Sequence, residues 1–315
     1  MSRRTVDPEL VAFLEQYPRF DLTHALLPEI RAGLAARMGA GPSSQQTSDI
    51  RCEERRIQGI NGAPEVRLLI YGQPAGGARP AILHIHAGGH VMGMPEMSDA
   101  QHRQFVSEVG CVVVSVAYRL APENPYPAGL QDCLSALRWL HLHADELGID
   151  AGRIALAGES AGAGMAVGLA LLVRDGNECP LRFLSLVAPM LDDRTDSGNE
   201  QSIRSRVMSW SPVSNRFGWN ALLDSIDDKS AIAYAVPARA KTFAGLPDTF
   251  ISVGSLDLFA PEDLNFATRL LEDDVNVELH LYPGAYHGFE RVTDARVSQQ
   301  FRADRQRALK NALES

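Results

Sequence analysis

The sequence predicts an α/β protein in which a mostly parallel sheet of eight strands is flanked by helices. Short apolar runs alternate along the chain with segments of helical periodicity, which is typical of parallel strands joined by helical crossovers. The 315 residues are 45% hydrophobic, which is enough to bury a large core in one α/β domain with an accessory segment. The sequence contains no internal repeat and no long low-complexity run.

Two predicted strands open the sheet, at 51–59 and 65–71, and Asn61, Gly62 and Pro64 favour a turn between them. The other strands are expected to be buried, because most of them are short runs rich in Val, Ile and Leu. They are predicted at 81–86, 111–118, 153–157, 182–188, 249–253 and 275–282.

Three helices are indicated by apolar periodicity and by residues that start or stop helices. Gly148 is well placed to end the first helix, whose apolar face consists of Leu130, Leu134, Leu137 and His141. Pro261, followed by two acidic residues, indicates the start of the second helix. The last helix is expected to carry an apolar face made of Val297, Phe301 and Leu309.

Two regions, 1–50 and 199–240, fit the strand–helix alternation poorly. We expect them to form one helical cap over a catalytic core made of 51–198 and 241–315. The second region brings aromatic residues close together, namely Trp210, Phe217, Trp219 and Tyr234. The alternative is a solvated tail and a long surface excursion, although unstructured loops of that length are uncommon in compact domains.

The charge balance excludes several classes of partner. There are 39 acidic and 30 basic residues, and the net charge of −9 repels phosphate backbones and anionic lipid surfaces. No stretch approaches the ~20 apolar residues of a membrane span, so we expect neither nucleic acid nor a membrane as partner. Near the start, Asp7, Pro8 and Glu9 interrupt any apolar run, which predicts a cytoplasmic protein. The four cysteines form no C-x-x-C pair and are expected to be reduced thiols.

The strongest motif is a G-x-S-x-G sequence at Gly158-Glu159-Ser160-Ala161-Gly162. It follows the apolar strand RIALA and precedes a helical run, which is the context of a nucleophile elbow. The turn exposes the serine hydroxyl, and the start of the following helix directs N–H groups and the positive end of its dipole at a developing oxyanion. The motif therefore predicts Ser160 as a catalytic nucleophile.

A second motif, His86-Ala87-Gly88-Gly89-His90, directly follows the strand AILHIH. In folds with a nucleophile elbow, the loop at this place supplies backbone N–H groups to an oxyanion hole. His84, His86 and His90 also raise the alternative of a metal site. No further ligand with recognisable spacing accompanies them, so no metal is expected.

Together these motifs resemble those of the bacterial hormone-sensitive-lipase-like serine esterases, and among them the heroin-esterase type. That family has H-G-G-G at the loop, G-[DE]-S-A-G at the elbow, H-G-F near the end, and a Y-R-L-A-P-E-x-x-x-P segment that residues 118–127 match. The resemblance covers essentially the whole core. It implies the α/β-hydrolase fold, with a mostly parallel eight-stranded sheet flanked by helices and a helical cap.

The resemblance also implies which amides form the oxyanion hole: those of Gly88, Gly89 and Ala161. Ala87 departs from the family, because it replaces the first glycine of H-G-G-G. Since the implied donors lie after it, the hole is expected to be intact. His86 is implied to orient the loop.

The base and the acid should follow the nucleophile in the order serine, acid, histidine. His280 and His287 lie late enough, but His280 alternates within a strand, whereas His287 follows the last strand and matches the family's H-G-F. Asp257 lies just beyond a strand end, at the edge where α/β sheets build their sites. Glu262 and Asp263 compete for this role, although they are read as charged first-turn residues that complement a helix dipole. A further acidic cluster, read as a solvated loop, contains Asp192, Asp193 and Asp196.

These assignments predict a carboxylesterase that hydrolyses short- to medium-chain esters through an acyl-enzyme, with no cofactor and with a small-molecule ester as its partner. Amide or thioester hydrolysis by the same triad, or a non-catalytic ligand receptor on this fold, are the alternatives. The rate is expected to fall at acid pH, with a midpoint near the ordinary histidine value of about 6.5 or below it. Relatives of this kind are often dimers, so a homodimer is also an expectation.

The aromatic residues of the second cap region are assigned to the substrate pocket. Bulky rings folded over the carboxyl edge of the sheet would bound an apolar pocket and exclude water from it. The alternative is that they anchor the cap or form a dimer contact. The residues concerned are Trp210, Phe217 and Trp219.

Overall fold

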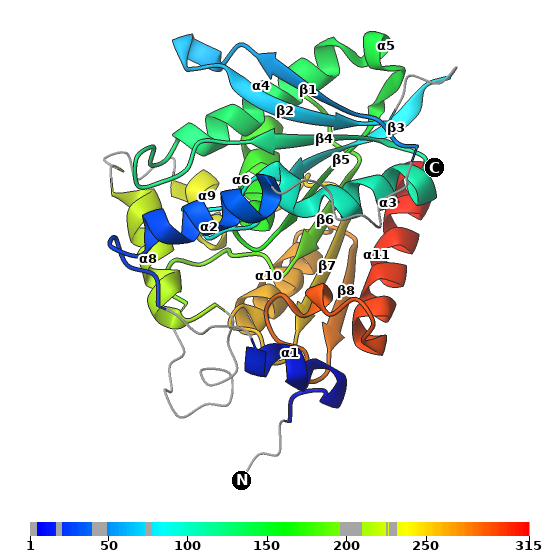
Figure 1. Cartoon of the computed structure of the whole chain (residues 1–315). Coiled ribbons are helices and arrows are strands. Elements are labelled where there is room, and N and C mark those ends of the chain that lie inside the picture. Colours follow the sequence, from blue (N-terminus) through cyan, green and yellow to red (C-terminus); the bar gives the residue numbers. More distant parts are fainter. Residues whose placement is uncertain are drawn as a thin grey trace.

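The computed structural model describes residues 5–16, 21–39, 49–72, 77–195, 210–224, 226 and 232–314. At its centre lies one eight-stranded sheet, with strand order β1-β2-β4-β3-β5-β6-β7-β8 and helices on both faces (Figure 1). The strands are β1 (Cys52–Ile57), β2 (Val66–Tyr71), β3 (Arg79–Ile85), β4 (Val112–Ala117), β5 (Ile149–Glu159), β6 (Phe183–Val187), β7 (Thr249–Gly254) and β8 (Val277–Tyr282).

The predicted strands and the α/β-hydrolase topology are confirmed. β2 pairs antiparallel with both β1 and β4, and every other neighbouring pair is parallel. β5 is longer than its apolar run predicted, because it begins at Ile149. Since β3 to β8 run in the same direction, their carboxyl ends meet at one edge of the sheet, where an α/β protein builds its site.

Helices cover both faces of the sheet and bury the alternating side chains of its strands. In β2, Leu68 and Ile70 pack on one side, whereas Leu69 and Tyr71 pack on the other, as the period of two in a strand requires. The first side is covered by α4 (Ala128–Leu142), α6 (Ala161–Asp175) and α10 (Ala260–Glu272). The second is covered by α3 (Asp99–Val109) and α11 (Arg296–Glu314) (Figure 1).

Two helix boundaries bear on the predictions. The helix expected to end at Gly148 consists of two helices, α4 and the short α5 (Ala144–Leu147), and Gly148 ends the second with φ 63°. The helix predicted to start at Pro261 begins one residue earlier, at Ala260.

The two regions set apart as a cap contact each other. These regions contain α2 (Leu27–Gly39), α8 (Pro212–Leu223) and the short α9 (Ile232–Ala235), which lie on the same side of the molecule (Figure 1). The amide of Leu22 donates to Ser214 Oγ at 3.0 Å, and the rings of His24 and Phe217 meet edge to face with their centroids 4.9 Å apart. These contacts join segments that are almost 200 residues apart in the sequence.

The first helix lies elsewhere. α1 (Val11–Gln16) and the turn before it pack against the loop that follows β8, where Leu10 and Leu14 are buried beside Tyr286. The hydroxyl of Tyr286 donates to the carbonyl of Leu10 at 3.1 Å. Residues 5–16 therefore support the loop that follows β8 and lie apart from α2 and α8.

A buried polar network fastens α11 to the sheet. Arg305, on the inner face of α11, donates to Glu159 Oε1 at 2.8 Å and to Ser185 Oγ at 2.9 Å. The other carboxylate oxygen of Glu159 lies 2.9 Å from Nε2 of His84. Burial raises the pKa of Glu159, but the neighbouring His84 and Arg305 outweigh it and hold that pKa far below its usual range. Glu159 is therefore an ionised carboxylate enclosed by partners.

Among the described helices, none is both long enough and apolar enough to cross a membrane.

We expect the polar network around Glu159 to contribute to stability. Arg305→Ala should lower the free energy of unfolding by about 3–5 kcal/mol, because it leaves the buried charge of Glu159 without its cationic partner. Lys310→Ala, at an exposed position of the same helix, should change it by no more than about 0.5 kcal/mol. Urea unfolding of the two variants checks this, and equal losses would show that the network does not stabilise the fold.

Candidate active site

Ser160 occupies the sharp turn between β5 and α6. Its backbone has φ 55° and ψ −121°, a conformation that is costly for a residue with a side chain. Hydrogen bonds hold it there: the amide of Ser160 donates to the carbonyl of Val187 at 2.8 Å, and its carbonyl accepts from the amide of Gly164 at 3.0 Å. The turn is therefore fixed on both sides by the chain around it.

The last glycine of the G-x-S-x-G motif explains why the turn lies beside the loop that begins at His86. The sequence assigns this loop to the oxyanion hole, and it is called the oxyanion loop below. A Cβ atom at Gly162 would lie only 2.1 Å from the carbonyl oxygen of Ile85, so no larger residue fits. α6 can therefore start directly against the end of β3, from which the oxyanion loop leaves.

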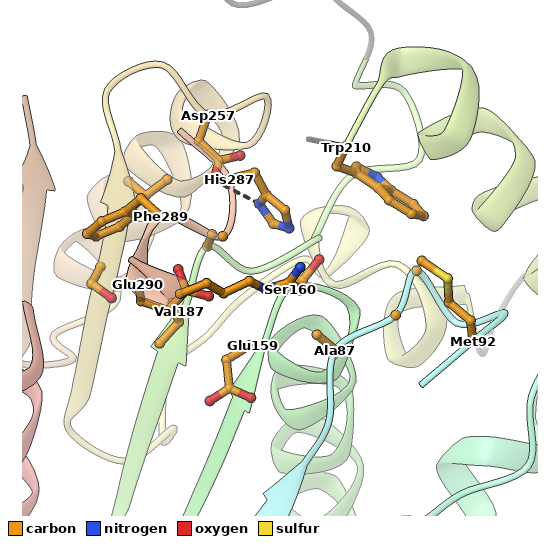
Figure 2. Close-up of a pocket in the computed structure, with 17 residues that line it drawn as sticks. Ala87, Met92, Glu159, Ser160, Val187, Trp210, Asp257, His287, Phe289 and Glu290 are labelled. Carbon is orange, nitrogen blue, oxygen red and sulfur yellow. Dashed lines mark hydrogen bonds and ion pairs between the residues drawn. The ribbon is translucent and has the colours of Figure 1, made fainter. Parts of the chain in front are cut away.

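Asp257 and His287 come from the loops after β7 and β8. Nδ1 of His287 lies 2.8 Å from Oδ2 of Asp257, and both residues are largely buried. The His287 ring lies between Asp257 and Ser160 (Figure 2). All three side chains line one cavity of about 80 Å³. The structure thus brings together the three residues assigned from the sequence as nucleophile, base and acid.

The environment of His287 alters its acidity. Burial lowers the pKa of the imidazole, but the charge of Asp257 and its hydrogen bond outweigh burial, so the pKa of His287 is raised above its ordinary value of 6.5. The sequence alone suggested an acid midpoint near or below about 6.5, whereas this environment favours a higher one. The sequence could not show the 2.8 Å contact with Asp257 that causes this shift.

The competing acids have other surroundings. Glu262 accepts a hydrogen bond from the amide of Leu191 at 2.8 Å and another from the hydroxyl of Thr195. Burial raises the pKa of Glu262 to about 8, and burial together with neighbouring Glu262 and Asp257 raises that of Asp263 well above its usual range. Both lie in the first turn of α10. Their predicted place in the first turn is thus confirmed, and Asp263 is fully buried while Glu262 is partly buried.

The acidic residues after β6 form ion pairs, whereas the sequence was read as a solvated loop there. Asp192 forms an ion pair with Arg194 at 2.7 Å, and Asp193 forms one with Arg239 at 2.7 Å. Asp196 lies outside the described residues.

The oxyanion loop takes its shape from two glycines with positive φ. Gly88 has φ 140° and Gly89 has φ 58°, whereas Ala87 is not among the residues with positive φ. A Cβ atom at Gly88 would lie 1.8 Å from the carbonyl oxygen of Met92. The backbone thus requires glycine at Gly88 but tolerates the alanine that departs from the family's motif.

The three histidines around this loop have separate partners. Nδ1 of His86 lies 2.9 Å from the carbonyl oxygen of Ala87, and its ring stacks on Tyr118 at 4.2 Å between centroids. His84 contacts Glu159, and the ring of His90 lies 5.4 Å from that of Trp219. Within the described ranges, no group of three or more His, Cys, Asp or Glu residues could hold a metal ion.

The aromatic residues of the cap divide into two groups. Trp210 lines the cavity and lies above Ser160 and Met92 (Figure 2). Phe217 and Trp219 do not line it: Phe217 packs on His24, and Trp219 is buried against His90. Their assignment to the pocket is therefore corrected: Phe217 packs within the cap on the segment before α2, and Trp219 packs against the loop that follows β3.

Sequence reasoning missed the partners of Glu159, which lines the cavity beside the nucleophile. One signal was available. Arg305 lies four residues after Phe301 and four before Leu309, so a cation occupies the apolar face of the last helix. A charge at such a position indicates a buried acidic partner.

Comparisons with known proteins find matches over most of the chain. A family model described as the alpha/beta hydrolase fold matches residues 82–291. The esterase LipI of Mycobacterium tuberculosis is 32% identical over 295 residues, which cover 91% of this chain and 89% of the relative. The carboxylesterase NlhH of the same species is 30% identical over 292 residues, which cover 92% of this chain and 90% of the relative.

Solved structures match over the same extent. The structure titled bacterial heroin esterase has a TM-score of 0.90 and 36% identity, and the match covers 99% of both chains. The esterase LipW from Mycobacterium marinum has a TM-score of 0.88 and 33% identity, over 98% of this chain and 96% of its own. The chain therefore belongs to the α/β-hydrolase fold family, in the hormone-sensitive-lipase-like branch that its motifs indicated.

Proposed function

We propose that this protein is a carboxylesterase that hydrolyses short- to medium-chain carboxylic esters through an acyl-enzyme on Ser160. The observation that carries the proposal is the 2.8 Å contact between His287 Nδ1 and Asp257 Oδ2, made in the cavity that Ser160 also lines. Relatives named carboxylesterase and esterase, which cover about nine-tenths of the chain, support the same class.

In the first half-reaction, the Ser160 hydroxyl oxygen attacks the ester carbonyl while Nε2 of His287 accepts the hydroxyl proton. Asp257 holds the imidazole in the tautomer whose Nε2 is unprotonated and stabilises the imidazolium that forms. When the tetrahedral intermediate collapses, the bond to the alkoxy oxygen breaks. His287 then returns the proton to the leaving alcohol.

The second half-reaction repeats these steps with water. His287 accepts a proton from water, whose oxygen attacks the acyl carbon, and the bond to Ser160 Oγ breaks. The serine regains its proton from His287, and the carboxylic acid is released. Each proton moves through the same imidazole, so the chemistry requires neither a metal nor an organic cofactor.

The negative charge on the carbonyl oxygen requires donors that are in place before the reaction. In the proposal these are the amides of Gly88, Gly89 and Ala161. Ala161 is the first residue of α6, and the first amides of a helix lack partners within it. The positive end of the helix dipole adds to the stabilisation of the oxyanion.

Three expectations remain predictions: the cytoplasmic location, the homodimer, and the division into a core and a cap. Amide and thioester hydrolysis use the same triad chemistry and stay as alternatives to be separated by substrate assays. A non-catalytic receptor on this fold is less well supported, because the complete set of nucleophile, base and acid is present in one cavity.

The proposed preference for short acyl chains rests on the cavity. Its volume is about 80 Å³, and apolar residues make up much of its wall, including Met92, Val187, Val253 and Trp210. Each methylene that enters contributes about 0.8 kcal/mol of apolar burial. A chain that reaches the wall gains nothing further, so a bounded cavity sets an upper limit on chain length.

The first prediction here concerns the nucleophile. Ser160→Ala should abolish hydrolysis of p-nitrophenyl acetate without changing the thermal unfolding midpoint, because only the attacking oxygen is lost. Ser107→Ala, at an exposed position of α3, serves as the control and should keep the wild-type rate. Wild-type turnover by Ser160→Ala would overturn the proposed mechanism.

The pH dependence follows from His287. Only the neutral imidazole accepts the serine proton, so kcat/KM should fall as the pH drops through the raised pKa of His287. The midpoint of this acid limb should lie above the ordinary histidine value of about 6.5. Initial rates with p-nitrophenyl butyrate from pH 5 to 9 measure it; a flat profile, or a midpoint below 6.5, would contradict the assignment.

Chain length tests the role of Trp210. Across p-nitrophenyl acetate, butyrate, octanoate and palmitate, kcat/KM should rise over the first few carbons and then drop. Trp210→Ala should move the optimum to longer chains because it removes part of the wall. Phe217→Ala, an aromatic truncation outside the cavity, should leave the optimum unchanged. A wild-type optimum at palmitate would exclude the bounded pocket.

A further inference from the structure

Residues of the cap pack directly against the backbone of the oxyanion loop. A Cβ atom at Gly89 would lie 2.1 Å from the Trp210 ring, and a Cβ atom at Gly218 in α8 would lie 2.6 Å from the carbonyl oxygen of Gly89. The rings of His90 and Trp219 lie 5.4 Å apart. The loop is thus in direct contact with the cap at two consecutive residues.

The other cap helix reaches the same loop through one side chain. Nε of Arg31, on α2, donates to the carbonyl oxygen of Val91 at 2.7 Å. Its Nη2 donates to the carbonyl oxygen of Ala121 at 2.6 Å, and the amide of Ala121 donates to the carbonyl of His90 at 3.0 Å. The guanidinium therefore joins the cap, the oxyanion loop and the segment after β4.

We propose that Arg31 is a positioning residue for the oxyanion hole, an inference that rests on the proposed function. The carbonyl of Val91 and the amide of Met92 belong to one peptide, and this amide donates to the carbonyl of Gly88 at 3.0 Å, so the peptide that Arg31 holds also closes the turn starting at Gly88. Fixing the carbonyl of Val91 from outside limits rotation of the peptides between Gly88 and Val91. The amides of Gly88 and Gly89 then keep one orientation.

The chemistry of the side chain suits this task. A guanidinium presents its donors in a rigid plane, so two of them can hold two carbonyl oxygens at fixed positions, and such charge-assisted bonds are short and strong. A lysine ammonium lacks this planar arrangement. Arg31 also pairs with Glu123 at 2.8 Å, but the Glu123 side chain is 59% exposed, and pairs of that kind contribute little.

Oxyanion stabilisation acts mainly in the transition state, so loss of the Arg31 contacts should lower kcat and leave KM almost unchanged. Arg31→Gln should lower kcat for p-nitrophenyl butyrate by about 10- to 100-fold, less than the ~10²–10³ that follows removal of a donor itself. KM should change by less than about twofold. The affinity for a trifluoromethyl ketone, whose carbonyl forms a tetrahedral adduct with the serine, should fall by the same factor as kcat.

Matched variants separate this role from general destabilisation. Arg31→Lys keeps the charge and the aliphatic stem and should still lose most of the effect. Glu123→Gln removes the ion pair but leaves both carbonyl contacts, and Arg37→Gln changes an exposed residue of the same helix; both should keep wild-type kcat. The midpoint of the acid limb should be the same in all variants, because the contact between Asp257 and His287 is untouched.

The outcomes are distinguishable from a failure of the proposed function. An inactive wild-type protein would overturn the esterase proposal and this inference with it. An active wild type with kcat within twofold in Arg31→Gln would overturn the inference alone. So would a loss of kcat without loss of ketone affinity, or an equal loss in Glu123→Gln.

Discussion

Ser160 has φ 55°, a backbone conformation that costs a residue of this kind about 1–3 kcal/mol, and the rest of the site depends on its being held there. β5 brings the chain to the sheet edge, α6 carries it away, and a glycine lets α6 start against the carbonyl end of β3. The oxyanion loop leaves that same strand. One strained turn therefore sets the distance between the nucleophile and the groups expected to stabilise the charge it creates.

Polar groups around this turn are buried in pairs. On one side of the sheet, Glu159 is enclosed by Arg305 and His84; on the other side of the site, Asp257 contacts His287. An isolated charge in such places would be costly, whereas a paired and hydrogen-bonded one is tolerated. The network around Glu159 supports the fold, whereas proton transfer is proposed for the pair of Asp257 and His287.

The strands, the turn at Ser160 and the positions of Asp257 and His287 after strand ends could be predicted because each depends on local sequence. The signals are apolar runs between turns, G-x-S-x-G between a strand and a helix, and polar residues just after strand ends. Other features depend on contacts between distant segments. Arg305 meets Glu159 across 146 positions, and no local pattern gives that pairing. Likewise, the sequence places Trp210 just before α8 and Phe217 within it, but only the packing of the cap decides that Trp210 lines the cavity while Phe217 packs on the segment before α2. The raised pKa of His287 has the same origin in a tertiary contact.

In the proposed mechanism Ser160 forms a covalent intermediate, and covalent trapping of this serine examines that step itself. The protein would be inactivated with a fluorophosphonate ester, which phosphonylates an activated serine, then digested and analysed by peptide mass spectrometry alongside the residual esterase rate. We expect one phosphonyl group per chain, located on Ser160, with a stoichiometry that matches the loss of activity. Complete inactivation with Ser160 unmodified, or with the adduct on another residue, would contradict the proposed mechanism.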